Sequence, residues 1–394
     1  MDIVIIANFI GELDYGNNNR FVYLANMLCS THMVELVSSD FNHGRKEKRK
    51  CDNFRFPYKV TLLHEPGYFQ NVCIKRFESH LVWGYAVKAY LENRKKPDMI
   101  YCAAPSLTAA RFAARFCKKN DIRFILDIQD LWPEAFQMVM NIPIVSNVAF
   151  HPFKMIANEI YRTADEVIAV SQTYVNRALE VNRKVKTGHS VFLGTRLETF
   201  DKNVKENPVS GKNSSEIWVG YCGTLGSSYD IRCVIDALEI LHNDRIRFIV
   251  MGSGPRRDEF EKYAQEKSVH AEFTGNLPYP VMCGKLAACD IVVNPITHGA
   301  AQSVINKHAD YVASGLPVIN TQECGEYRDL VDTYHMGFNC ENGNPAEVAE
   351  RIKQLVDNDA LRKEMGQNAR RCAEEKFDRA MTYQEILDVV ENHV

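Results

Sequence analysis

The chain has 394 residues, of which 46% are apolar and 25% charged, and its formal net charge is −3. This balance excludes a largely disordered chain, and the length favours two domains because a single core rarely exceeds about 250–300 residues. No apolar run approaches the roughly 20 residues of a membrane-spanning helix. The 12 cysteines form no CxxC pair, which indicates a reduced, cytoplasmic protein without a disulfide framework or a cysteine zinc site.

The charge is unevenly distributed. Residues 1–196 carry 26 Lys and Arg against 19 Asp and Glu, whereas the remainder carries 21 against 31. The densest basic cluster consists of Arg45, Lys46, Lys48, Arg49 and Lys50. It is explained either as a solvated charged loop or as a surface that docks on an anionic membrane. The chain has no nucleic-acid-binding motif, so no nucleic-acid partner is predicted. The excess of basic residues in the first half predicts a peripheral position on the inner face of the cell membrane.

Strand-like runs and helical patterns alternate in the first half. The expected strands are Ile3–Ala7, Val34–Val37, Met99–Cys102, Phe124–Asp127, Glu166–Val170 and Ser190–Leu193, and the expected helices are Phe21–Cys29, Leu107–Lys118 and Gln172–Val181. Residues 198–215, with Pro208 and Gly211 among polar residues, break this pattern. We expect a first domain over 1–197 and a linker over 198–215.

The alternation restarts at Ile217. The expected strands are Ile217–Cys222, Arg247–Met251, Glu272–Thr274, Asp290–Asn294, Pro317–Asn320 and Gly337–Cys340, with helices between them and helical sequence to the end of the chain. We expect a second domain over 216–376 and a C-terminal helix over 377–394. The fold class is therefore α/β, with two doubly wound, Rossmann-like parallel-sheet domains and a ligand site in the cleft between them.

Two strands of the second domain end in glycine turns. Gly223 and Thr224 follow the first strand, and Gly252, Ser253 and Gly254 follow the second. Glycines allow a phosphate or base to approach the backbone, although a tight turn alone also explains them. Neither turn matches the P-loop or the dinucleotide fingerprint.

A third strand leads into a loop and a helix. Residues 302–306, from Gln302 to Asn306, would lie at the helix N-terminus, where free N–H groups and the helix dipole favour a diphosphate. Lys307 would add a positive charge, and Asp310, one turn further on, could accept hydrogen bonds from a ribose. An ordinary amphipathic helix remains the alternative.

The segments VGYCGTLGSSYDI, IVMGSGP, EFTGNL, CDIVVNP, NKHADYVASGLPVI, DIQDLWPEAF and ADEVIAVSQ stand in this order along the chain. In this arrangement the chain resembles the GT-B glycosyltransferases of family 4, which are retaining enzymes. The DLWPE segment is similar to the branch that builds capsule, O-antigen and exopolysaccharide.

The resemblance implies roles for individual residues. The family's acidic pair falls on Gln302 and Asp310, and Lys307 matches the lysine of this branch. Donor contacts are implied for Gly16 and Asn17 in the first domain, and for the glycine turns, Asn276, Leu277, Ser303, Val304, Ile305 and Asn306 in the second. Basic residues that many members have near Thr224 and Ser228 are missing, which leaves Lys307, Arg232 or Arg256 to neutralise a diphosphate.

In the first domain, many members have a histidine where this chain has Gln129, so Asp130 is the polar group that we expect to act there. The alternative for Asp130 is a helix cap for residues 131–136. The catalytic candidates are thus Asp130, Lys307 and Gln302.

The one Asp-x-Asp, Asp357–Asp359, lies between C-terminal helices and suits a turn, so no metal and no other cofactor is expected. The resemblance implies retaining transfer of a hexosyl, N-acetylhexosaminyl or deoxyhexosyl group from a nucleoside-diphosphate sugar. Uridine is favoured as the base, and the expected acceptor is a polyprenyl-diphosphate-linked saccharide. An epimerase of the same fold and a non-catalytic partner subunit of a transferase remain open.

Overall fold

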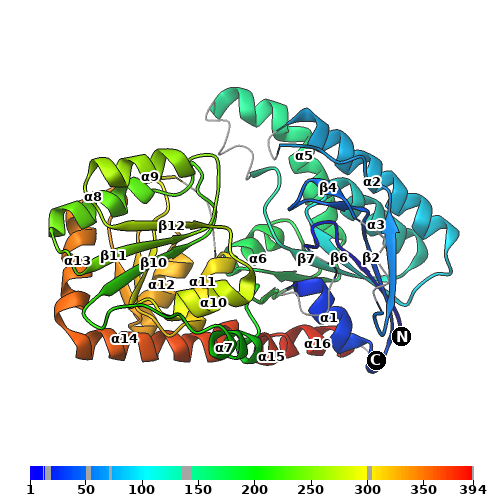
Figure 1. The fold of residues 1–394 in the computed structure, drawn as a ribbon. Coiled ribbons are helices and arrows are strands. Elements are labelled where there is room, and N and C mark those ends of the chain that lie inside the picture. The colour runs from blue at the N-terminus through cyan, green and yellow to red at the C-terminus, as the bar shows by residue number, and fades with distance from the viewer. Residues whose placement is uncertain are drawn as a thin grey trace. The chain divides into compact units, whose positions relative to one another are not determined.

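The computed structural model describes residues 1–11, 13, 19–49, 55–70, 73–134, 143–299 and 304–392. It divides into two compact units (Figure 1). Unit 1 comprises Met1–Val191 and Tyr383–Val394, and unit 2 comprises Phe192–Thr382. Each unit is built around its own parallel sheet.

Unit 1 contains a seven-stranded sheet in the order β5-β2-β1-β6-β7-β8-β9, with every neighbouring pair parallel. Its strands are β1 (Asp2–Ile6), β2 (Met33–Ser39), β5 (Lys59–Leu63), β6 (Met99–Ala104), β7 (Arg123–Ile128), β8 (Glu166–Ala169) and β9 (His189–Ser190). A small antiparallel hairpin, β3 (Phe41–Asn42) with β4 (Glu47–Lys48), follows β2.

The described helices of unit 1 are α1 (Arg20–Leu28), α2 (Ile74–Asn93), α3 (Leu107–Asn120), α5 (Pro143–Thr163), α6 (Gln172–Leu179) and α16 (Gln384–Glu391). The C-terminal helix α16 belongs to this unit because Ile386 and Val390 are buried in the same core as Ile3 and Ile5 of β1. Arg123 reinforces this packing, since its guanidinium donates to the carbonyl of Val390 at 2.8 Å.

Unit 2 contains a six-stranded parallel sheet in the order β12-β11-β10-β13-β14-β15. Its strands are β10 (Ile217–Cys222), β11 (Ile246–Met251), β12 (Ala271–Gly275), β13 (Ile291–Asn294), β14 (Val318–Asn320) and β15 (Gly337–Asn339). Successive residues of β10 belong to different cores: Val219 and Tyr221 pack in one, and Trp218 and Cys222 in the other. The central strand is therefore buried on both faces, as expected of a doubly wound sheet.

The helices of unit 2 are α7 (Leu197–Glu206), α8 (Ile231–Leu241), α9 (Arg257–Glu266), α10 (Tyr279–Ala287), α11 (Asn306–Ala313), α12 (Gly325–Tyr334), α13 (Pro345–Asp357), α14 (Asp359–Cys372) and α15 (Arg379–Thr382), with a π-helical turn at Ala373–Phe377. The segment 198–215, expected to be a linker, thus contains most of α7. That helix packs in unit 2 because Leu197 and Phe200 are buried in its core.

Within the described part of the chain, no helix has both the length and the apolar character required to cross a bilayer.

Candidate functional site

The carboxyl ends of three neighbouring strands of unit 2 are joined by main-chain hydrogen bonds. Gly223 after β10 donates to Met251 at 2.9 Å, and Leu225 donates to Ser253 at 2.9 Å. Gly252 donates in turn to Gly275, at the end of β12, at 2.9 Å. The structure therefore brings together the two glycine turns and the stretch after β12.

Two of these glycines are required by the contact between the turns themselves. A Cβ atom on Gly252 would lie 1.9 Å from the carbonyl oxygen of Gly223, and one on Gly254 would lie 2.3 Å from that of Leu225. A Cβ atom on Gly223 would instead lie 3.2 Å from the Tyr221 hydroxyl and 3.8 Å from Lys307 Nζ. Gly252 and Gly254 are therefore required by the packing of the two turns, whereas Gly223 lies next to a charged side chain.

Lys307, in the first turn of α11, supplies that charge. Lys307 is 7% exposed, and its ammonium has no hydrogen-bond partner among the residues that the structure describes. Nζ lies 3.9 Å from the ring centre of Tyr229 and 4.5 Å from that of Tyr221. Burial lowers the pKa of Lys307 to about 7. A buried cation without a partner is costly and is ready to pair with an anion.

Asp310, one turn further along α11, is held by a chain of hydroxyl groups. Its Oδ1 accepts a hydrogen bond from Tyr279 at 2.8 Å, and the Tyr279 hydroxyl lies 3.0 Å from that of Thr195. Burial raises the pKa of Asp310 to about 6, although the Tyr279 hydrogen bond opposes this shift. Asp310 is therefore a weakly acidic carboxyl group one helical turn from the lysine.

The raised pKa makes the Asp310→Asn variant informative about stability. A carboxyl group with a raised folded pKa contributes stability that is present below about pH 4 and lost as the pH rises through about 6. Asparagine keeps an acceptor for Tyr279 and has no charge to bury. We expect the free energy of unfolding of the variant to exceed that of the wild type by about 1–3 kcal/mol at pH 7.5 and to differ little from it at pH 4. Urea titrations at both pH values check this, and an equal difference at both would contradict it.

The other predicted donor contacts differ in how far they are buried. Thr224 and Asn276 are exposed, Ser253 is partly buried, and Leu277 packs against the hydrophobic core. Val304 is 4% exposed and belongs to that core, Ile305 is the residue before α11, and Asn306 opens the helix with its side chain exposed. Gly16, Asn17, Gln302 and Ser303 lie outside the described residues.

The two arginines considered as alternatives to Lys307 share one carboxylate. Arg256 contacts Glu259 at 2.6 Å and Arg232 contacts the same oxygen at 3.0 Å. Lys307 is therefore the cation of this set that has no acidic partner among the described residues.

Asp130, in unit 1, follows β7. Its Oδ1 accepts from the main-chain N–H of Leu131 at 2.9 Å, and its Oδ2 accepts from the indole N–H of Trp132 at 3.2 Å. Burial raises its pKa above the usual range. The Gln129 side chain donates to the buried Asp127 at 2.5 Å, which turns it away from solvent.

The basic cluster forms the β3–β4 hairpin, and its described side chains have partners within unit 1. Arg45, Lys46, Lys48 and Arg49 contact, respectively, Glu47, the ring of Tyr68, Asp40, and the carbonyls of Ile10 and Gly11. Lys50 lies outside the described residues. The hairpin's charges are thus largely used in local contacts.

Three tyrosines and Thr195 were not predicted from sequence. Tyr221 and Tyr229 flank Lys307, while Tyr279 and Thr195 hold Asp310. The Tyr279–Asp310 contact joins residues 31 positions apart and the Thr195–Tyr279 contact joins residues 84 apart. No local pattern signals such pairings.

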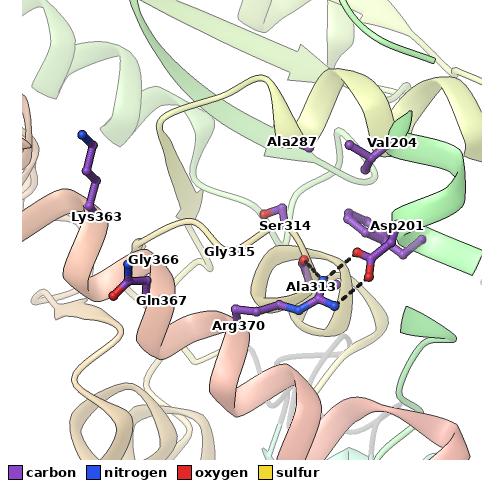
Figure 2. A pocket seen from close by; sticks show the side chains of 11 residues that line it. Asp201, Val204, Ala287, Ala313, Ser314, Gly315, Lys363, Gly366, Gln367 and Arg370 are labelled. Atoms are coloured by element: carbon purple, nitrogen blue, oxygen red, sulfur yellow. Dashed lines mark hydrogen bonds and ion pairs between the residues drawn. The ribbon is translucent and has the colours of Figure 1, made fainter. Parts of the chain in front are cut away.

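A pocket of about 480 Å³ lies at the opposite end of α11 (Figure 2). Ala313, Ser314 and Gly315 line it together with residues of α7 and α14. Arg370 crosses it and makes two hydrogen bonds of 2.7 Å to the Asp201 carboxylate. None of the predicted site residues is among the residues that line this pocket.

Comparison with known proteins identifies the fold as that of the GT-B glycosyltransferases. A structure of Alr3699/HepE from Anabaena in complex with UDP superposes with a TM-score of 0.73 at 17% identity, covering 100% of both chains. Residues 203–372, which contain the strand ends, Lys307 and Asp310, match the family described as "Glycosyl transferases group 1".

Two curated relatives match at lower coverage. The probable glycosyltransferase WbjE of Pseudomonas aeruginosa is 23% identical over 60% of this chain and 60% of its own length. The putative colanic acid biosynthesis glycosyl transferase WcaI of Escherichia coli is 24% identical over 62% of each. The chain thus spans about 60% of the length of these relatives.

Proposed function

We propose that the chain is a glycosyltransferase that moves a sugar from a nucleoside-diphosphate sugar to a hydroxyl of a polyprenyl-diphosphate-linked saccharide. Unit 2 binds the donor and unit 1 binds the acceptor. The transferred group is a hexosyl, N-acetylhexosaminyl or deoxyhexosyl residue, and transfer proceeds with retention and without a metal ion at the donor. The product is a surface polysaccharide, in keeping with the assignment of the relative WcaI to colanic acid biosynthesis.

The Lys307 ammonium, which has no hydrogen-bond partner among the described residues, is the observation that carries this proposal. It lies beside Gly223, which has no side chain of its own, and at the start of α11, where the helix dipole also favours an anion. In a low-dielectric setting, one such preorganised donor contributes about 3–4 kcal/mol to stabilising a leaving group. The lysine would thus neutralise the diphosphate as it departs.

Asp310 and the turns after β11 and β12 would bind the nucleoside. The Asp310 Oδ2 atom is not used by Tyr279 and could accept a ribose hydroxyl. We favour uridine, since HepE was solved with UDP. The departing phosphate oxygen would accept the proton of the acceptor hydroxyl, and Asp130 would contact the acceptor.

The acceptor side of the proposal depends on charge. The excess of positive residues in 1–196 suits an anionic lipid diphosphate and an anionic inner membrane surface. Because the hairpin cations have local partners, we ascribe surface attraction to unit 1 as a whole, with the largely exposed Arg45 as one contributor.

A melting-temperature panel with UDP, GDP, ADP, dTDP and CMP tests the donor assignment. At 100 times its dissociation constant, a ligand stabilises the fold by about 2.7 kcal/mol. We expect a shift with UDP that is the same with and without EDTA, each compared with the ligand-free protein in the same buffer. No shift with any nucleotide would favour a non-catalytic partner subunit. Donor turnover without an acceptor would favour an epimerase.

The lowered pKa of Lys307 predicts that UDP binding takes up a proton. In the free protein the ammonium loses its proton above about pH 7, and a bound diphosphate would restore it. At pH 8 we expect uptake of about 0.9 proton per UDP, and an affinity that falls by up to about tenfold per pH unit above 7. Calorimetry in two buffers of different ionisation enthalpy measures the uptake. A value near zero would place the diphosphate away from Lys307.

A further inference from the structure

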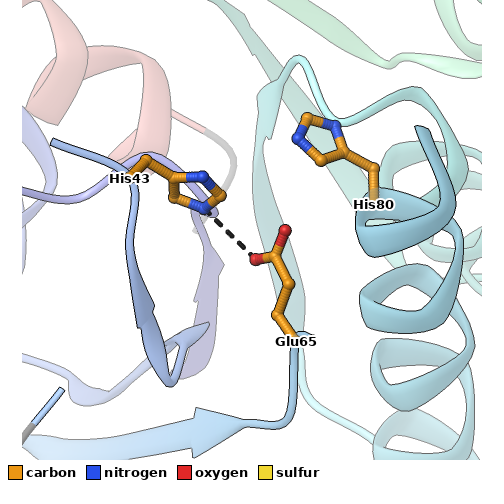
Figure 3. A group of neighbouring side chains, drawn as sticks. All are labelled: His43, Glu65 and His80. Carbon is orange, nitrogen blue, oxygen red and sulfur yellow. Dashed lines mark ion pairs between the residues drawn. The ribbon is translucent and has the colours of Figure 1, made fainter. Parts of the chain in front are cut away.

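Four buried polar side chains converge beside the sheet of unit 1. Asn8 follows β1, His43 follows β3, Glu65 follows β5, and His80 lies in α2. Their exposed fractions are 1%, 8%, 0% and 4%. Figure 3 shows the Glu65 carboxylate between the two imidazole rings. No residue of this cluster was singled out by the sequence, and none takes part in the proposed donor site.

Several polar atoms of this cluster lack hydrogen-bond partners among the described residues. They are Glu65 Oε2, both ring nitrogens of His80, and Asn8 Nδ2. Leaving such buried polar atoms unsatisfied is costly. The ligand atoms of His43, Glu65 and His80 lie within 4.8 Å of one another, and His43 Nε2 is 3.2 Å from Glu65 Oε2. The ligand atoms of these three residues are therefore close enough together to share one ion.

The surrounding contacts orient these groups. The His43 Nδ1 atom lies 2.9 Å from the Tyr68 hydroxyl, which leaves Nε2 directed at Glu65. Ser79 donates to Glu65 Oε1 at 2.8 Å, and Oε2 is the carboxylate oxygen next to His43. His80 is stacked on Trp132 with a ring separation of 5.2 Å and an interplanar angle of 3°. Outer partners of this kind accompany the ligands in protein metal sites.

The cluster offers two imidazole rings and one carboxylate as ligands. Two cations lie near the cluster and would repel a bound ion. Arg76 lies 4.7 Å from the ring centre of Trp132, and Lys46 lies 4.4 Å from that of Tyr68.

We propose that His43, Glu65 and His80 bind one divalent first-row transition-metal ion of the zinc class. Two imidazole nitrogens and a carboxylate oxygen are a common ligand set for such ions. The amide oxygen of Asn8 is hydrogen-bonded to His43 Nε2 at 2.6 Å, and an ion bound at Nε2 would replace this hydrogen bond. The ion would join the ends of β3 and β5 to α2, and it would fix the Trp132 ring whose N–H holds Asp130. It is separate from the donor site.

Metal analysis of the full chain, purified without a histidine tag, tests this site. The protein is stripped with a chelator, reloaded with Zn²⁺ or Co²⁺, desalted and assayed for metal per chain. The test variants are Glu65→Gln, which keeps an acceptor for Ser79, and His80→Gln. His64→Gln is the matched control, because His64 precedes Glu65 and its side chain is 65% exposed.

We expect one ion per chain in the wild type and in His64→Gln, and at least about 100-fold weaker binding in both test variants. The Co²⁺ protein should absorb in the visible range without thiolate charge-transfer bands. Circular dichroism verifies that each variant is folded. If both test variants fail to fold, Ser79→Ala replaces them, with an expected loss of about tenfold in affinity.

Three results would overturn the site: no ion retained by the wild type, equal metal content in wild type and folded test variants, or thiolate bands that assign the ion to cysteine. An unchanged affinity in Ser79→Ala would do the same.

Discussion

Replacing Lys307 by methionine is expected to stabilise the chain and, in the same variant, to weaken UDP binding. Holding the lysine pKa near 7 instead of 10.5 costs about 3–5 kcal/mol at neutral pH. Cation–π contacts with Tyr221 and Tyr229 return about 1–2 kcal/mol of that. Methionine fills a similar volume without a charge, so we expect a net gain of about 2–3 kcal/mol in the free energy of unfolding.

The pH dependence of this gain has a definite sign. Because the folded pKa is lowered, wild-type stability rises with pH from about 7 towards 10.5, and the advantage of methionine shrinks over that range. The loss of one charge-assisted contact should weaken UDP binding by about 10- to 150-fold, which corresponds to about 1.5–3 kcal/mol. Urea unfolding and calorimetry provide both values.

Lys262→Met is the matched control for this substitution. Lys262 lies in α9 of the same unit with its side chain 77% exposed, so its replacement should change both quantities by less than about 0.5 kcal/mol. A Lys307→Met protein that is less stable than wild type, or that binds UDP equally well, would contradict the role given to this lysine.

Gly252→Ala is expected to be strongly destabilising. The residue has a φ of +147°, and its new Cβ would lie 1.9 Å from the carbonyl oxygen of Gly223. Backbone strain contributes about 1–3 kcal/mol and the clash about 1–3 kcal/mol more, so a loss of about 3–5 kcal/mol is expected. Unfolding titrations measure it, and soluble expression measures it when the variant fails to fold.

Substitutions at two further glycines separate the contribution of backbone strain from that of the steric clash. Gly343 has a φ of +68° with nothing near its Cβ position, so Gly343→Ala measures backbone strain alone. Gly325 has neither a positive φ nor a close neighbour, and Gly325→Ala should be nearly neutral. If Gly252→Ala lowered the free energy of unfolding by no more than Gly343→Ala does, this result would contradict the close contact between the two turns.

The sequence predicted the parallel-sheet elements well because their signals are local. The six residues of β10 are all buried, and a run such as Ile217–Cys222 is apolar for that reason. Helix α11 begins at Asn306, within the stretch 302–306 predicted for its N-terminus, and the preceding residue Ile305 is extended. Lys307 and Asp310 fall on one helix, three residues apart.

Longer-range features were not accessible to such patterns. Helix α2 was not assigned because its buried face includes Ser79, His80 and Gly84, which weakens the apolar periodicity. Helix α7 was taken for a linker because it is mostly polar and buries few residues. The partners of Asp310 and the convergence of His43, Glu65 and His80 arise only when segments far apart in the sequence pack together.

A crystal structure of the chain with UDP tests the central claim most directly. The account predicts a diphosphate oxygen within about 3 Å of Lys307 Nζ, beside Gly223 and at the N-terminal end of α11. It also predicts a ribose hydroxyl on the Asp310 carboxylate. A bound UDP whose phosphates lie elsewhere, with the Lys307 ammonium still buried between Tyr221 and Tyr229 and unpaired, would contradict it.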